Sequence, residues 1–161
     1  MLSFILFFEN ILFLKNIMKI PNYDVKTNKL PSKKLNDIFH EDFRLLIAGQ
    51  TRCGKTNTLM HILRQPLVCY DEIYIYTPNH QQDKIQDFKK LMDSISEKVG
   101  YPILEIGEEQ DIRNTNEYPS GNRKVVVFHD LVNAPDKIQN KIANHYTDGR
   151  HLPNLLVTIL L

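Results

Sequence analysis

Short apolar runs alternate along most of the chain with segments whose apolar residues recur at helical spacing. Phe43–Ala48 is a nearly continuous apolar run, which is typical of a strand buried on both faces in a parallel sheet. Glu72–Thr77 and Lys124–Phe128 are rich in β-branched and aromatic residues and predict two more strands. Tyr101–Ile106 predicts a further short strand, and Leu155–Leu161 predicts the last one.

Three segments between these runs predict helices. The first covers Asn57–Arg64 and stops at Pro66, and its apolar face consists of Leu59, Ile62 and Leu63. The second is long and ends at Gly100, in the usual C-cap position, and its apolar face consists of Ile85, Phe88, Leu91, Met92, Ile95 and Val99. The third lies between Pro135 and Gly149, and its apolar face consists of Ile138, Ile142, Ala143 and Tyr146. Strands that alternate with helices predict an α/β fold with a parallel sheet.

The remaining segments suggest how the chain is divided. Gly107–Arg123 is acidic and polar and predicts a loop or insertion, and residues 21–40 predict an irregular lead-in. A chain of 161 residues has room for one domain with its own core. We therefore expect residues 1–40 to form an apolar N-terminal segment with its lead-in, and residues 41–161 to form the domain.

Residues 1–17 are rich in Leu, Ile and Phe. Glu9, Asn10 and Lys15 interrupt the run, so that it makes a marginal membrane helix, and it lacks the features of a signal peptide. Three interpretations stay open: an interfacial membrane anchor, an apolar strap on the domain, or translated sequence upstream of an ancestral start. The polar stretch that begins at Met18 favours the last.

Charge and cysteine content narrow the function only slightly. The formal net charge is +1, which does not by itself indicate a nucleic-acid partner. Cys53 and Cys69 form neither a disulfide framework nor a metal site, so that we expect reduced thiols in an intracellular setting.

The segment Gly49–Thr56 matches the phosphate-binding pattern G-x-x-x-x-G-K-[ST]. Its glycines let consecutive N–H groups point at a phosphate, and the helix that follows adds the positive end of its dipole. Lys55 is expected to reach the β- and γ-phosphates, and the Thr56 hydroxyl to hold Mg²⁺. The predicted nucleotide-binding residues are Gly49, Gln50, Thr51, Arg52, Cys53, Gly54, Lys55, Thr56 and Asn57.

A phosphate loop of this kind works with a carboxylate at the end of a nearby strand. The strand Lys124–Phe128 leads into His129 and Asp130. A neutral imidazole is a poor ligand for Mg²⁺, and strand alternation turns Asp130 to the other side. Asp130 is expected to activate water or, after a backbone adjustment, to bind the metal; a helix- or turn-capping role is the alternative. For His129 a structural role is favoured.

The ordered set FRLLIAGQTRCGKTNTLMHIL, DEIYIYTPN, KVVVFHDLV and DGRH resembles the poxvirus-type genome-packaging ATPases, in the FtsK/HerA branch of P-loop motors. The resemblance implies a three-layer, RecA-like P-loop NTPase core with a mostly parallel sheet, incomplete at the C-terminus. It implies ATP and Mg²⁺ as ligands, double-stranded DNA and ring neighbours as partners, and relatives in virus-derived mobile elements. In this fold the strand matching Leu155–Leu161 lies between the phosphate-loop strand and the acidic strand, which leaves the phosphate-loop strand at an edge.

Departures from the family pattern predict weak or absent hydrolysis. His129 stands at the family's metal-binding aspartate, Arg52 replaces what is commonly a glycine, and the polar sensor after the last strand has no counterpart. Arg150 is expected either to sense the γ-phosphate, with Lys55 and Asp130 as the other catalytic residues, or to satisfy carbonyls at a helix end.

Three functions compete at this point. The chain is a DNA-directed motor ATPase, a non-catalytic remnant of one, or another P-loop enzyme. An N-K-x-D guanine-recognition element is not found, which disfavours a GTPase, and the acidic segment Gly107–Arg123 is unlike the arginine-rich lid of a nucleotide kinase.

Overall fold

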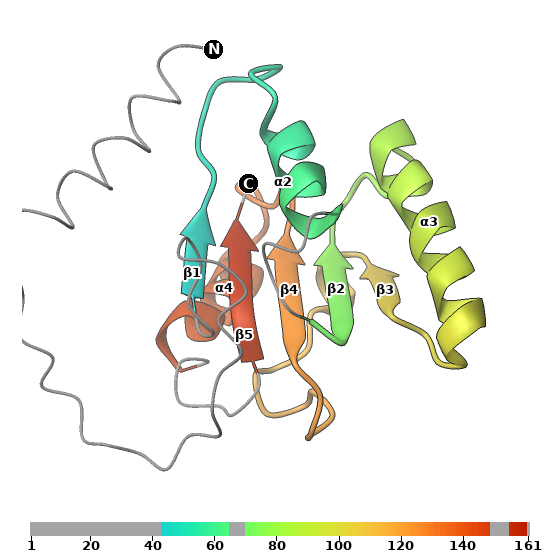
Figure 1. The fold of residues 1–161 in the computed structure, drawn as a ribbon. Helices are drawn as coiled ribbons and strands as arrows, with labels where there is room; N and C mark the ends of the chain where they lie inside the picture. Colours follow the sequence, from blue (N-terminus) through green and yellow to red (C-terminus); the bar gives the residue numbers. More distant parts are fainter. Residues whose placement is uncertain (1–42, 65–69, 149–154, 161) are drawn as a thin grey trace, which may run out of the picture. The chain divides into compact units, whose positions relative to one another are not determined.

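The computed structural model describes residues 43–64, 70–148 and 155–160. In these ranges five strands form one sheet, in which all neighbouring strands are parallel. The strands are β1 (Phe43–Leu46), β2 (Glu72–Tyr76), β3 (Leu104–Gly107), β4 (Lys124–Phe128) and β5 (Leu155–Leu160). Their order across the sheet is β1-β5-β4-β2-β3 (Figure 1). The predicted α/β fold with a parallel sheet is confirmed.

Strand β5 lies between β1 and β4, as expected. It pairs Leu160 with Leu46 of β1 on one side and with Phe128 of β4 on the other. Among the described strands, β1 consequently lies at an edge of the sheet. The expectation that both of its faces are buried is wrong, because its residues are only partly buried and Leu46 is 63% exposed. By contrast, every residue of β4 is buried.

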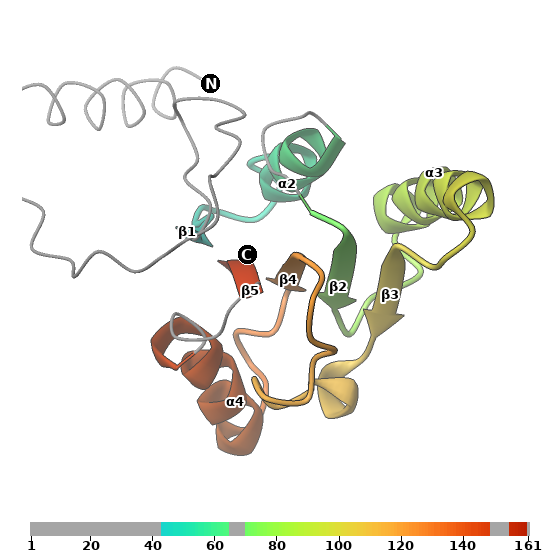
Figure 2. The same ribbon diagram turned by 60° about the horizontal axis from the view of Figure 1, so that its bottom comes forward.

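Helices cover both faces of the sheet. The helices α2 (Lys55–Arg64) and α3 (Asp83–Val99) lie on one face, and α4 (Asp136–Thr147) lies on the other (Figure 2). Alternation along β2 and β4 divides the core accordingly. Ile73, Ile75, Val125 and Val127 pack with α2 and α3, whereas Tyr74, Tyr76, Val126 and Phe128 pack with Ile142 of α4.

The segment between β3 and β4 also covers the sheet. The prediction of a loop is confirmed apart from a short 3-10 helix at Glu109–Asp111. Arg113 lies 4.9 Å from the centre of the Tyr74 ring and binds both carboxylate oxygens of Glu105, at 2.8 and 2.9 Å. Tyr118 packs edge-on against Tyr74, with ring centres 5.0 Å apart. The tyrosines of β2 therefore pack against other side chains on this face of the sheet.

Helix ends follow their predicted signals where the structure describes them. Gly100 ends α3 with a left-handed φ of 83° and donates its N–H to Ser96 O at 2.9 Å. Pro135 precedes α4 directly. Gly149, the N-terminal segment 1–40 and Cys69 lie outside the described residues. Within the described ranges no helix has the length and apolar character needed to cross a bilayer.

His145 of α4 is buried on the face of the sheet that α4 covers. The His145 side chain lies within hydrogen-bond distance of Lys141 O at 2.7 Å, through Nδ1, and of the Tyr118 hydroxyl at 3.1 Å, through Nε2. Because Lys141 O can only accept, Nδ1 carries the proton and Nε2 accepts from Tyr118. Burial lowers the pKa of His145, so that the neutral ring is the folded form near neutral pH.

Replacement of Ile75 by alanine tests the packing between the sheet and α2 and α3. Ile75 is fully buried, and its truncation leaves a cavity, so that we expect a loss of about 2–5 kcal/mol in unfolding free energy. Chemical denaturation of Val132→Ala is the control, because Val132 is 78% exposed and its truncation should cost less than about 0.5 kcal/mol. Equal losses in the two variants would contradict this core.

Burial of His145 makes the stability of the fold depend on pH. The pKa of His145 is lower in the folded chain than in the unfolded chain, where it is about 6.5. As the pH is lowered, the unfolded state therefore binds a proton before the folded state does. The contribution of His145 to the free energy of unfolding is fully present above about pH 6.5 and is lost as the pH falls below that value. We expect denaturation midpoints to drop between pH 7 and pH 5, and to drop less in His145→Gln. An unchanged slope in the variant would contradict the assignment.

Candidate phosphate-binding site

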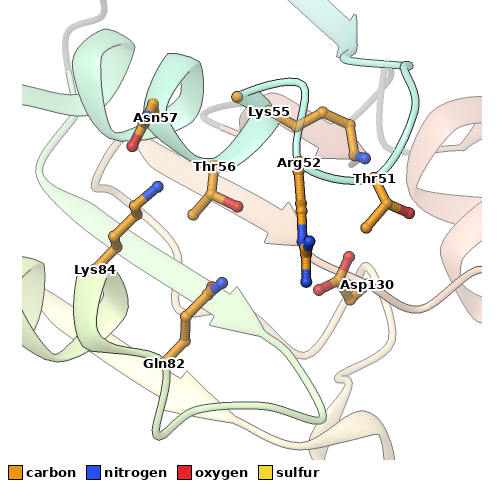
Figure 3. A pocket seen from close by; sticks show the side chains of 9 residues that line it. Thr51, Arg52, Lys55, Thr56, Asn57, Gln82, Lys84 and Asp130 are labelled. Carbon is orange, nitrogen blue, oxygen red and sulfur yellow. The ribbon is translucent and has the colours of Figure 1, made fainter.

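Three loops meet at the carboxyl edge of the sheet. One leads from β1 into α2, another follows β2 and leads into α3, and the third contains His129 and Asp130 after β4. They enclose a pocket of about 380 Å³ (Figure 3). The pocket is lined by Thr51, Arg52, Gly54, Lys55, Thr56, Asn57, Gln82, Lys84 and Asp130.

The loop between β1 and α2 is sharply curled. Arg52 and Gly54 have left-handed φ angles of 66° and 97°. The Cys53 N–H donates to Gln50 O at 3.2 Å, and the Thr58 N–H donates to Gly54 O at 3.0 Å. Alternation of left-handed and ordinary residues turns successive N–H groups toward one side and makes a concavity for an anion. A left-handed φ also explains why glycine would suit the position that Arg52 holds.

Gly49 allows the Cys53 side chain to approach the backbone closely within this loop. A Cβ atom at Gly49 would lie 2.6 Å from Cys53 Sγ, which is closer than real contacts permit. Any larger residue at Gly49 would push the Cys53 side chain out of its position. Gly49, Gln50 and Cys53 belong to the loop but do not line the pocket.

Lys55 begins α2 and turns back over the loop. Its ammonium group donates to Gly49 O at 3.0 Å and to Gln50 O at 3.3 Å. Both bonds are exposed, so that water or an anion can replace them without leaving a buried group unpaired. The ammonium group is thus placed next to the concavity and is available to a ligand.

His129 is buried beside Thr56. Its Nε2 lies 3.1 Å from Thr56 Oγ1, and its Nδ1 lies 3.2 Å from Thr77 Oγ1. Burial lowers the pKa of His129; the nearby Lys55 acts in the same direction, and Asp130 opposes them. The ring is therefore neutral near pH 7. A structural role for His129 fits its burial, whereas its contact with Thr56 could not be predicted from the sequence pattern.

Asp130 lies next to His129 but faces the pocket. Its left-handed φ of 56° breaks the strand alternation that would turn the side chain away. The carboxylate is 55% exposed, and its Oδ2 lies 3.5 Å from His129 Nδ1. Among the described residues it accepts no hydrogen bond from a helix or turn N–H, which speaks against the capping role.

Helix α3 adds two residues that the sequence analysis missed. Gln82 precedes α3 without capping it through its side chain, and its Oε1 is buried without a hydrogen-bond partner in the described structure. Lys84 lies in the first turn of α3 and lines the pocket. No carboxylate among the described residues forms an ion pair with it. The only signal for these residues is topological, because the parallel β2 brings the start of α3 to the edge that the β1 loop occupies.

The electrostatics of the pocket favour an anion. Among the described residues of the lining, Arg52, Lys55 and Lys84 are cationic, and Asp130 is the one carboxylate. The N-termini of α2 and α3 both adjoin the pocket and add the positive ends of their dipoles. Cations outnumber carboxylates, so that a multiply charged anion such as an oligophosphate matches the site.

The predicted metal ligands fit Mg²⁺ poorly. Thr56 and Asp130 both line the pocket, but the group next to the Thr56 hydroxyl is an imidazole nitrogen. Mg²⁺ prefers oxygen ligands. Within the described ranges no three His, Cys, Asp or Glu residues lie close enough to hold a metal ion by themselves. Arg150, the remaining predicted catalytic residue, lies outside the described residues.

Comparisons with known proteins do not identify a family for this chain. No protein-family model, curated protein or solved structure matches the chain. Inference about function therefore rests on the loop, the pocket and the sheet order. The resemblance to genome-packaging ATPases stays a prediction.

Removal of the Lys84 charge tests the pocket without reference to a nucleotide. We expect Lys84→Ala to weaken binding of inorganic tripolyphosphate roughly tenfold, because a charged hydrogen bond is lost. The matched control is Lys90→Ala, which removes the same charge from an exposed position on α3. Titration calorimetry measures both. Equal weakening in the two variants would show that only overall charge matters.

Proposed function

We propose that this chain binds ATP in a RecA-like P-loop NTPase domain and hydrolyses it slowly or not at all. The observation that carries the proposal is the position of Gly49–Thr56 between a parallel strand and the first turn of a helix. The loop there combines two left-handed residues with an exposed ammonium group and a hydroxyl group. A loop that follows a strand and leads into a helix is the structural context in which this sequence pattern predicts phosphate binding.

The order of strands supports the same proposal. β5 separates the phosphate-loop strand β1 from β4, which carries His129 and Asp130 at its carboxyl end. Both loops nevertheless line one pocket, because parallel strands end at the same edge. This is the arrangement that the resemblance to P-loop motors leads one to expect.

Each residue has a role that follows from its position. Loop N–H groups and the N-terminus of α2 bind the phosphates, and Lys55 leaves its carbonyl partners to bind their oxygens. The Thr56 hydroxyl faces the pocket, where it would contact the cation that accompanies the nucleotide. Arg52 and Lys84 provide further positive charge around the phosphates.

Weak hydrolysis follows from the surroundings of Asp130. A general base works best when it is held close to the water that it activates. The Asp130 side chain is more than half exposed, and its described ionic contact is with His129. The position beside Thr56 belongs to the neutral ring of His129, which does not supply the negative charge of a carboxylate.

Two more specific functions are compatible with nucleotide binding, and they require different properties of the site. A non-catalytic, nucleotide-binding remnant of an ATPase requires only the loop, and His129 beside Thr56 favours it. A motor that moves double-stranded DNA in a ring of subunits also requires hydrolysis, and it comes from the resemblance alone. Slow or absent turnover is thus the property that separates them.

Nucleotide binding is tested by calorimetric titration of the chain with ATP. We expect Lys55→Ala to weaken ATP binding about tenfold or more, because the ammonium group beside the phosphates is lost. Lys98→Ala, which removes an exposed charge at the far end of α3, should bind ATP like the unmodified chain. Failure of the folded, unmodified chain to bind ATP would refute the proposal.

Hydrolysis is tested by phosphate release from ATP with Mg²⁺ present. We expect the unmodified chain to release little phosphate, and His129→Asp to release more, because a carboxylate then lies beside Thr56. Asp130→Asn in the His129→Asp background should abolish the gain if Asp130 activates water. Brisk turnover by the unmodified chain would contradict this part of the proposal.

A further inference from the structure

The lining of the pocket has an excess of positive charge. Among its described residues, Arg52, Lys55 and Lys84 are cationic and only Asp130 is a carboxylate. The free ATP anion carries more negative charge than its complex with a divalent ion, because the ion neutralises part of the phosphate charge. Coulomb attraction to this lining is therefore stronger for the free anion than for the metal complex.

Lys84 lies on the side of the pocket where a metal ion would be expected. Figure 3 shows its side chain extending from the start of α3 toward the first turn of α2, where Thr56 and Asn57 lie. Thr56 carries the hydroxyl group that the phosphate-loop pattern assigns to Mg²⁺. An ammonium group on this side repels a divalent ion, and its N–H groups can themselves bind phosphate oxygens. Lys84 can thus supply the positive charge that the ion would otherwise bring.

The negative charge that a metal ion needs is poorly placed in this pocket. Mg²⁺ at nucleotide sites is usually held through one or two carboxylates as well as the phosphates. Beside the Thr56 hydroxyl lies the neutral ring of His129, with Nε2 at 3.1 Å from Oγ1. Figure 3 shows the Arg52 side chain extending from the loop toward Asp130, so that the carboxylate of the lining faces a guanidinium group. The side chains present therefore fit a phosphate chain better than they fit Mg²⁺.

We propose that the site binds its nucleoside triphosphate as the free anion, in preference to the complex with Mg²⁺. The Lys84 ammonium group takes the place of the ion beside Thr56. The inference rests on the proposed nucleotide binding, and it departs from the resemblance to packaging ATPases, which implies Mg²⁺ as a ligand. It agrees with weak hydrolysis, because phosphoryl transfer at phosphate loops uses the ion to neutralise developing charge.

Titration of the unmodified chain with ATP in two buffers tests the proposal without any variant. One buffer contains EDTA and the other an excess of Mg²⁺, and sodium chloride keeps their ionic strengths equal. We expect ATP to bind about threefold or more tightly in EDTA, because the free anion keeps the charge that the ion neutralises. No gain in affinity in EDTA, or tighter binding with Mg²⁺, would overturn the proposal.

Substitution of Lys84 by methionine tests the role of its ammonium group. Lys84→Met keeps an unbranched side chain and removes the charge. We expect it to weaken binding of ATP in EDTA about tenfold and to remove the advantage over the Mg²⁺ complex. Lys90→Met, at an exposed position of the same helix, is the matched control and should keep that advantage. An unchanged ratio of affinities in Lys84→Met would overturn the role given to this residue.

Substitution of His129 by aspartate tests the converse, because it places a carboxylate beside Thr56. We expect Mg²⁺ to tighten ATP binding by His129→Asp about tenfold, since the ion then has an oxygen ligand of opposite charge nearby. His61→Asp, at an exposed histidine of α2, is the matched control and should still prefer the free anion. A folded His129→Asp chain that still prefers the free anion would overturn the explanation from missing negative charge.

The two-buffer titration also separates this inference from the proposed function. If the folded, unmodified chain binds ATP in neither buffer, the proposed function itself is wrong. If it binds ATP but more tightly with Mg²⁺, only the preference for the free anion is refuted. This comparison decides the matter even if His129→Asp fails to fold.

Discussion

The parallel direction of all five strands is the constraint on which the site depends. Parallel strands place their carboxyl ends along one edge, so that the loops after β1, β2 and β4 meet although they are far apart in the sequence. Reversal of any of these strands would carry its loop to the opposite edge of the sheet. The connecting helices make the parallel arrangement possible, and their own N-termini then adjoin the same pocket.

The elements were predictable to the extent that their patterns are local. β4 has its predicted bounds and Gly100 ends α3. A continuous apolar run and a glycine after the last turn of a helix each predict one local structure more strongly than any other. The exposure of Leu46 differs from the prediction, because an apolar run does not reveal how far other elements cover each face of a strand. Of the predicted residues, which are Gly49–Asn57 and Asp130, most meet at one pocket, but Gly49, Gln50 and Cys53 do not line it. Gln82 and Lys84 were missed because nothing near them in the sequence records which loop they face.

His129 shows why a departure from a pattern is hard to interpret without coordinates. In the sequence it is an imidazole in place of a carboxylate, which indicates loss of a ligand. In the structure the ring is buried, kept neutral by burial, and held between the hydroxyl groups of Thr56 and Thr77. A buried carboxylate there would carry a desolvation cost that the neutral ring avoids. The substitution thus changes the chemistry of the position and keeps it tied to the phosphate loop.

Arg52 combines a cost and a benefit that respond differently to ionic strength. An ordinary residue with a left-handed φ costs on the order of 1 kcal/mol relative to glycine, and this steric strain is indifferent to dissolved ions. The attraction of its guanidinium group for an anion in the open pocket is electrostatic, and mobile counterions weaken it. The attraction opposes the strain most in dilute buffer and least in concentrated salt, whereas the strain is the same in both. The conformational balance of the loop should therefore shift with salt more than that of a loop with glycine at this position.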